Sequence, residues 1–139
     1  MLTLKERARR WGAAALTMLT IFVLSARPGA ELPDFGWADA IIKKGGHVLG
    51  YGMLALAYWN GFGWERRRML PAWGLAVLYG ASDELHQAFV PGRHPGALDI
   101  LVFDNLGAAL ALWLGRLIRA RSMGAPRDKK VSPSRSGPA

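Results

Sequence analysis

Four apolar stretches separated by short polar connections are the feature that most restricts what this chain can fold into. They cover residues 11–26, 45–64, 69–89 and 97–115 of the 139-residue sequence. A helix needs roughly 20 predominantly apolar residues to cross the hydrocarbon core of a bilayer, with about 17 to 25 observed. The second and fourth stretches meet this requirement, and the first is slightly short. We therefore expect an all-α polytopic membrane protein, a four-helix transmembrane bundle.

The third stretch reaches spanning length only if it includes polar residues. It runs for 13 residues from Met69 to Ala81 and then meets the segment Ser82–Arg93, which contains acidic residues, a histidine and a Pro-Gly-Arg turn. A charged side chain at the centre of a membrane helix costs about 2.5–3.5 kcal/mol on insertion scales. Side chains retained at this cost pair with one another or line a polar cavity.

Basic residues predict the orientation of the helices. If both termini are cytoplasmic, the inner segments hold 14 of the 18 lysines and arginines, as expected for cytoplasmic loops. We expect a basic N-terminus at residues 1–10, a membrane domain at 11–118 and a disordered basic tail at 119–139, which is rich in Ser, Pro and Gly. The expected location is the plasma membrane, which the chain would cross several times.

Two other interpretations of the basic and apolar segments are less favoured. Residues 11–26 behind a basic start resemble a signal peptide, but Arg27 and Pro28 fit badly just after a cleavage site. Nucleic acid is not an expected partner, because no aromatic interleaving accompanies the basic tails and membrane topology already explains them. The sequence has no cysteine, which excludes a disulfide framework and a thiolate metal site.

Polar residues of different stretches fall at similar expected depths. Helices joined by a short turn run antiparallel, so Glu84 and Asp104, each six residues from the outer turn, should lie roughly 9 Å below it. Lys44 and His47 enter from the same side. Tyr51 follows one helical turn deeper, on the same face as His47. This arrangement predicts an outward-facing polar site in the outer half of the bilayer.

Helix periodicity limits which side chains can face one pocket. Asp83 and Gln87 share one face of their helix, whereas Glu84 is about 100° away. The expected polar or ligand-binding residues are Lys44, His47, Tyr51, Glu84, Gln87, Arg93 and Asp99. A second tier comprises Asp83, Asp104 and Asn105. No catalytic residue, metal ligand or cofactor is assigned, although His47, Glu84 and Asp99 are a chemically reasonable set for a divalent ion.

The same residues carry a resemblance to a known family. The matching pieces are Leu24-Ser25-x-x-Pro28-Gly29-x-x-Leu32-Pro33, Lys44-x-x-His47-x-x-x-Tyr51, Glu84-x-x-Gln87-x-Phe89-x-Pro91-Gly92-Arg93, and Asp99 followed by Asn105-x-Gly107. In their order and spacing they resemble VanZ-like membrane proteins over residues 20–115. The resemblance implies a multi-span envelope protein, in a family whose namesake is associated with low-level resistance to the glycopeptide teicoplanin.

The chain departs from the family pattern on the last helix. In that pattern an Asp is followed four residues later by Asn or Asp, whereas Asp99 is followed by Asp104 and Asn105 at five and six residues. Either the helix is locally irregular or one member of the pair has moved.

Three functional interpretations remain open. The first is a protein that binds an envelope lipid or a lipid-linked cell-wall component, with basic side chains for an anionic headgroup. The second, less favoured because no nucleophile motif is present, is an enzyme that uses His47, Glu84 and Asp99 for acid–base or metal chemistry. The third is an ion-pair network that stabilises a small membrane scaffold. The expected partners are the bilayer and such a lipid, and an oligomer is an open alternative.

Overall fold

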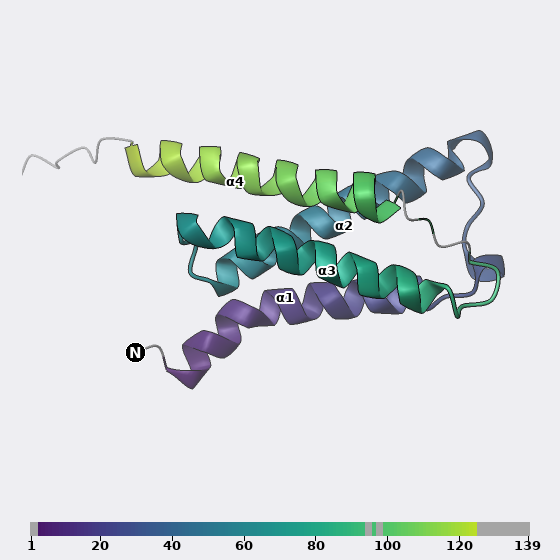
Figure 1. Ribbon diagram of the computed structural model, residues 1–139, viewed down its shortest axis with the longest axis horizontal. Coiled ribbons are helices and arrows are strands. Elements are labelled where there is room, and N and C mark those ends of the chain that lie inside the picture. The colour runs from purple at the N-terminus through teal and green to yellow at the C-terminus, as the bar shows by residue number, and fades with distance from the viewer. Residues whose placement is uncertain (1–2, 94–95, 97–98, 125–139) are drawn as a thin grey trace, which may run out of the picture.

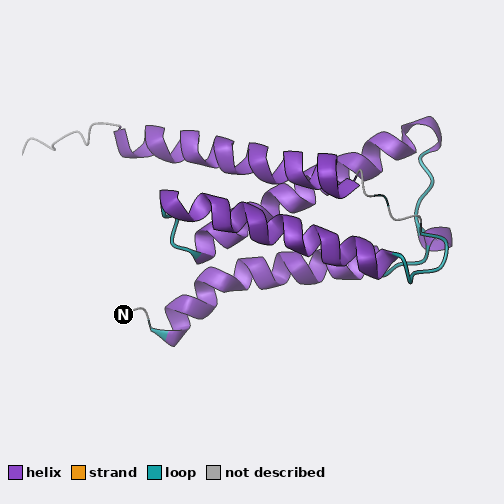
Figure 2. Ribbon diagram, viewed as in Figure 1, coloured by secondary structure: helices purple, strands orange, loops and turns teal. Residues whose placement is uncertain are grey.

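The described residues form four long helices, and Figures 1 and 2 show how these helices are arranged. The computed structural model describes residues 3–93, 96 and 99–124, and no strand occurs among them. The long helices are α1 (Leu4–Ser25), α2 (Asp39–Gly61), α3 (Met69–Gln87) and α4 (Asn105–Gly124). Shorter helical turns connect them: η1 (Gly29–Glu31), η2 (Gly36–Ala38), η3 (Arg66–Arg68) and η4 (Asp99–Asp104). The all-α, four-helix prediction is confirmed at this level.

No helix in these described ranges combines the length and the apolarity that a membrane crossing requires.

The helices extend beyond the apolar stretches at several ends. The first helix begins at Leu4, where the Thr3 side chain caps the backbone of Glu6 and the Glu6 side chain accepts from the Thr3 backbone. This reciprocal arrangement satisfies two of the unpaired amides at a helix start. The second helix begins six residues before the apolar stretch at residue 45. The fourth continues to Gly124, past the expected start of the tail at residue 119, and the remainder of that tail lies outside the described residues.

The polar segment of the third stretch is helical, as the span-length argument predicts. The third helix runs to Gln87 and therefore contains Asp83 and Glu84. It ends before Pro91, whose ring cannot continue a helix. The acidic residues are thus held on a rigid element in place of a loop.

The second helix is central and packs against the other three helices. Its contact with α4 is close because small residues meet there. A Cβ built at Gly52 would lie 3.1 Å from the Gly107 carbonyl oxygen and 3.2 Å from the Ala111 Cβ. At Gly107 an added Cβ would overlap the backbone of Val48. Small residues at four-residue spacing let helix backbones approach, and here they bring α4 against α2.

Candidate functional site

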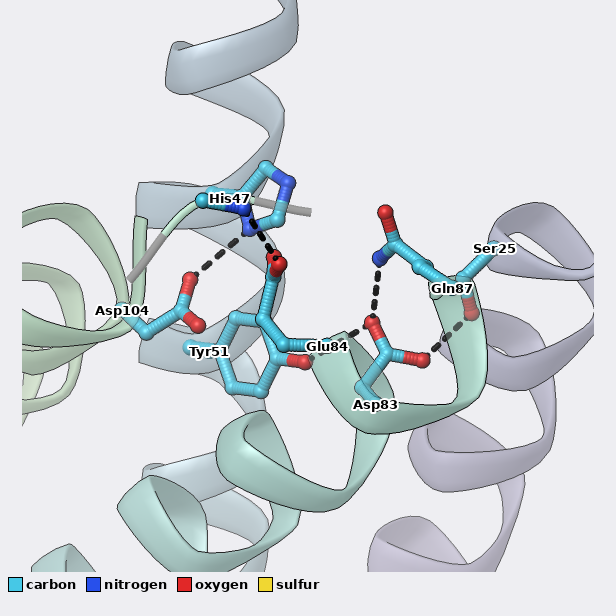
Figure 3. A network of polar contacts seen from close by, with 8 residues as sticks. Ser25, His47, Tyr51, Asp83, Glu84, Gln87 and Asp104 are labelled. Carbon is cyan, nitrogen blue, oxygen red and sulfur yellow. Dashed lines mark hydrogen bonds and ion pairs between the residues drawn. The ribbon is translucent and has the colours of Figure 1, made fainter. Parts of the chain in front are cut away.

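A buried carboxylate on α3 is the centre of a polar network between three helices. Asp83 is 5% exposed. One of its oxygens accepts a hydrogen bond from the hydroxyl of Ser25 at the end of α1. The other accepts from the Tyr51 hydroxyl on α2 at 3.1 Å and from the Gln87 amide at 2.9 Å. Figure 3 shows these donors converging on the carboxylate. Neutral donors therefore satisfy this acidic group inside the bundle.

A second buried carboxylate binds the histidine of α2. Asp104, the last residue of η4, is 1% exposed, and its Oδ1 lies 2.9 Å from His47 Nδ1. The His47 ring stacks on the Tyr51 ring with centroids 6.0 Å apart. The two carboxylate networks thus meet at Tyr51, which hydrogen-bonds Asp83 and stacks on His47.

A glycine on α3 makes room for this second network. A Cβ at Gly80 would lie 2.8 Å from Asp104 Oδ2 and 3.3 Å from Tyr51 Cε1. Both distances are shorter than an ordinary van der Waals contact. A side chain at this position would therefore displace the carboxylate or the tyrosine ring.

The segment before α4 is a π-helix, which accounts for the unusual acidic spacing. It runs from Asp99 to Asp104. In a π-helix the hydrogen bonds join residues five apart, so positions 99 and 104 lie one turn apart along the backbone. The local irregularity considered from the sequence is therefore present. The side chain of Asp99, an expected site residue, lies outside the described part of the structure.

The Pro-Gly-Arg turn after α3 is hydrogen-bonded to the end of α1 and to the loop that follows it. The guanidinium of Arg93 donates from Nη2 to the Leu24 carbonyl at 2.8 Å and from Nε to the Arg27 carbonyl at 3.1 Å. The Gly29 amide donates to the Pro91 carbonyl at 3.0 Å. Carbonyls at a helix C-terminus lack partners within the helix. Arg93 supplies donors for them and joins two sequence motifs that are more than 60 residues apart.

Glycine is required on both sides of this junction. A Cβ at Gly29 would overlap the carbonyl group of Gly92. Gly92 itself has a φ of +72°, a conformation that side chains with a Cβ rarely adopt. The close approach of the two loops therefore depends on both residues.

A cleft of about 270 Å³ opens beside these networks. Its polar lining consists of Lys43, Lys44, His47, Gln87 and Arg93. The ammonium of Lys44 lies 4.6 Å from the centroid of the Phe103 ring. Lys43 forms an ion pair with Asp39 at 2.6 Å, and its hydrogen bond holds the pKa of that carboxyl below its ordinary value. The cleft is therefore bordered by cations, with His47 and Gln87 linking it to the buried carboxylates.

The model of the family described as VanZ/LLP1 matches residues 3–119. The chain belongs to the VanZ/LLP1 family. The matched range includes all four long helices, apart from the last residues of α4, and every polar residue of the two networks. No curated protein and no solved structure matches the chain.

This VanZ/LLP1 chain brings most of the expected site residues to one end of the bundle. Lys44, His47, Gln87 and Arg93 line the cleft, and Tyr51 lies behind it. Glu84 is buried, with 6% exposure, and its Oε2 accepts a hydrogen bond from the Gly96 amide at 2.8 Å. Glu84 thus anchors the connection after α3.

Asn105 lies apart from the cleft-lining group. Its Oδ1 accepts a hydrogen bond from Trp73 Nε1 at 2.7 Å, so it ties α4 to the first half of α3. Among the side chains that the structure describes, no three His, Asp or Glu residues are grouped as a metal site. The side chain of Asp99 is not among the described side chains and is therefore not covered by this statement.

The structure raises the importance of two residues that the sequence placed in the second tier. Asp83 and Asp104 are the acceptors around which the networks form, whereas helix periodicity alone left their orientation undecided. Ser25 was not expected to take part. Its position in the Leu24-Ser25 motif of the family was the available signal, but that motif does not reveal a partner 58 residues away.

Proposed function

We propose that this VanZ/LLP1 protein is an integral membrane protein of the cell envelope that binds a phosphate-bearing lipid, such as a lipid-linked cell-wall component. The observation that carries the proposal is the cleft of about 270 Å³ with Lys43, Lys44 and Arg93 in its lining. Hydrogen bonds from ammonium and guanidinium groups to phosphate are charge-assisted and roughly twice as strong as neutral ones. The cleft therefore favours an anionic ligand.

The distribution of apolar side chains supports placement in a bilayer. Large apolar side chains are exposed on the long helices, among them Leu16, Leu19, Leu70, Leu78 and Ile118. Soluble monomers rarely expose contiguous apolar patches of more than a few hundred Å². In a bilayer, acyl chains would cover these side chains, which would avoid the free-energy cost of exposing them to water.

The acidic side chains are compatible with this placement. They lower the mean hydropathy of α3 and of the segment before α4, but Asp83, Glu84 and Asp104 are at most 6% exposed. Ionisable groups within membranes almost always face the interior of a bundle or a polar cavity. The surface that would face lipid is consequently more apolar than the average of each helix sequence.

The cleft offers more than positive charge. The amide nitrogen of Gln87 donates to Asp83, which leaves the amide oxygen as an acceptor for a hydroxyl or amide N–H of a ligand. Lys44 is held over the Phe103 ring, where cation–π attraction restrains it without neutralising its charge. This combination suits a headgroup that carries both a phosphate and a polar sugar or peptide part.

Binding can be tested with a short-chain polyprenyl diphosphate and with a polyprenyl alcohol of equal length. The full chain, purified in neutral detergent, should bind the diphosphate saturably and the alcohol weakly. Lys44→Gln should reduce the affinity about tenfold, the effect of losing one charge-assisted hydrogen bond. The matched control is Arg121→Gln at the end of α4, which should change nothing. Equal binding of diphosphate and alcohol would exclude an anion site.

A second candidate function is catalytic, because the cleft includes an aspartate–histidine pair. Asp104 Oδ1 accepts from His47 Nδ1, and His47 also lines the cleft. Such a carboxylate fixes the tautomer and orientation of the imidazole and stabilises its protonated form. His47 could then act as a general base towards water or a ligand hydroxyl. Incubation of the purified protein with a labelled lipid-linked precursor distinguishes the candidates: turnover that His47→Gln abolishes would favour an enzyme.

A further inference from the structure

A second polar cleft lies at the opposite end of the bundle from the candidate site. Its volume is about 430 Å³. Its lining residues belong to the first turns of α1, the end of α2 and the connection between α2 and α3. Figure 1 shows these segments at the end of the bundle that holds the N-terminus. Its lining combines three arginines with two aromatic residues and one acid: Arg7, Arg10, Arg68, Trp11, Phe62 and Glu65.

One wall of this inner cleft is aromatic and closely packed. The rings of Trp11 and Phe62 meet edge to face with centroids 5.2 Å apart. A Cβ built at Gly61 would lie 2.8 Å from the Trp11 ring, so the bare backbone at that position allows the indole to approach α2. Trp11 is partly exposed. Amphipathic aromatic rings of this kind are enriched where a membrane meets water.

The arginines are positioned by the surrounding backbone. Arg10 Nη1 lies 2.7 Å from the place that a Cβ would occupy at Gly63, a residue with a φ of +75°. The side-chain amide of Asn60 donates to the Arg10 carbonyl at 3.2 Å. The guanidinium of Arg68 lies 5.7 Å from the Phe62 ring centroid. The tight turn after α2 therefore leaves space for the Arg10 guanidinium, and Arg68 lies beside the aromatic wall.

Positive charge exceeds negative charge in the inner cleft. Three guanidinium groups line it beside the single carboxylate of Glu65. The Arg68–Glu65 pair is separated by 3.9 Å and both side chains are more than half exposed. An exposed pair at this distance contributes little energy. An anion that enters the cleft can therefore compete for these arginines.

We propose that the inner cleft binds the phosphate headgroup of an anionic phospholipid in the leaflet opposite to the candidate site. Guanidinium groups bind phosphate oxygens in a planar, bidentate manner. Basic pockets between helices on the cytoplasmic side of membrane proteins bind such headgroups. A phospholipid fits better than free phosphate, because Trp11 and Phe62 offer an apolar wall to the glycerol and acyl parts. This inference rests on the proposed function only for the placement of the bundle in a membrane.

The test uses the full chain in neutral detergent, titrated with short-chain phosphatidylglycerol, short-chain phosphatidylcholine and inorganic phosphate. Native mass spectrometry counts the bound molecules, and the unfolding midpoint follows the affinity. The variant Arg7→Gln/Arg10→Gln/Arg68→Gln removes the lining charges. The matched control, Arg9→Gln/Arg66→Gln/Arg67→Gln, removes equal charge at the same end without changing a lining residue.

Phosphatidylglycerol should bind saturably to the unchanged chain and to the control. Its affinity should fall at least about tenfold in the lining variant, since charge-assisted hydrogen bonds are lost. Equal loss in both variants would indicate diffuse surface charge and overturn the proposal. Binding of phosphatidylcholine or inorganic phosphate as tightly as phosphatidylglycerol would also overturn it.

Two further measurements keep the result decisive. If the triple variant does not fold, Arg10→Lys retains the charge but loses the bidentate geometry, and unchanged affinity for phosphatidylglycerol would then contradict the proposal. Binding that Lys44→Gln removes belongs to the candidate site, whereas binding that the inner-cleft variants remove belongs here. The proposal for the inner cleft and the proposal for the candidate site can therefore be refuted independently.

Discussion

Arg93 donates a hydrogen bond to the carbonyl oxygen of Leu24 at 2.8 Å, although the two residues are 69 positions apart in the chain. The same guanidinium reaches the Arg27 carbonyl. One side chain thus fastens the end of α1 to the turn that follows α3. The cleft borders this junction, so its shape depends on a long-range contact that involves no carboxylate.

Replacing Arg93 by Gln should loosen this junction. The two carbonyl contacts are partly exposed, so the expected loss in stability is about 1 kcal/mol, below the usual value for hydrogen bonds from a charged group. Thermal unfolding in detergent measures the loss. Arg93→Lys should restore little of it, because an ammonium lacks the planar fork that spans two acceptors. Full rescue by lysine would show that charge, and not the fork, matters at this position.

The Asp83 carboxylate should be the most sensitive group of the buried network. Asp83→Asn replaces one acceptor oxygen with an NH₂ group. In one orientation of the amide this group faces the Ser25 hydroxyl, and in the other it faces the Tyr51 and Gln87 donors, so at least one donor loses its acceptor. The expected cost is about 2 kcal/mol, within the range for a buried polar group left unsatisfied. Tyr51→Phe removes a single donor and should cost about 1 kcal/mol. Similar stability of Asp83→Asn and the unchanged chain in denaturant titrations would contradict the network described here.

Gly80 and Gly74 provide a matched pair on α3. Gly80→Ala places a methyl group against Asp104 and Tyr51, and overpacking of this kind costs about 1–3 kcal/mol. Gly74 has no atom within 4 Å of an added Cβ. Gly74→Ala should therefore stabilise the helix by up to about 1 kcal/mol. The two unfolding midpoints should move in opposite directions, and a shift of both in the same direction would argue against crowding at Gly80.

The pKa of Glu6 should report the cap at the start of α1. Hydrogen bonds from Thr3, first from its backbone and then from its side chain, hold the pKa of Glu6 below its ordinary value. A depressed pKa stabilises the folded state above the unfolded pKa, and this contribution disappears as the pH falls through the folded pKa. Thr3→Ala should raise the pKa of Glu6, measured by NMR titration of a chain with labelled glutamate. An unchanged value would show that the Thr3 side chain does not take part in the cap in solution.

Helix positions were largely predictable because apolar length and charge are local properties. The stretch at residues 69–89 predicts α3 closely, including its polar end, because the length expected of a spanning helix includes residues 82–87 in the prediction. The starts of α1 and α2 were less predictable. The first turn of α1 is polar, and its Thr3–Glu6 cap is recognised by capping residues and not by apolar content. The first turn of α2 is largely apolar but is separated from the apolar stretch at residue 45 by Lys43 and Lys44.

The backbone conformation between Asp99 and Asn105 could not be predicted from the spacing of the acidic residues alone. The interval of five residues indicates that a regular α-helix would separate the two acids, and the irregular helix was one of two open explanations. A π-helical turn between α3 and α4 decides the matter. Local propensity does not predict such turns well, because π-helical hydrogen bonding is rare and occurs mostly as single turns next to or within α-helices.

The sequence by itself determined the four-helix pattern and the family, and it predicted that His47, Tyr51 and Gln87 lie near the same end of the bundle. Periodicity, charge bias and motif order are properties of the linear sequence, so they can be recognised without knowing which residues are in contact. Only the tertiary structure decided that Asp83 and Asp104 are the acceptors, that Ser25 joins them and that Arg93 caps α1. These facts depend on how each helix is rotated about its axis, and that rotation is set by close contacts such as Gly107 against Val48, between residues far apart in the chain.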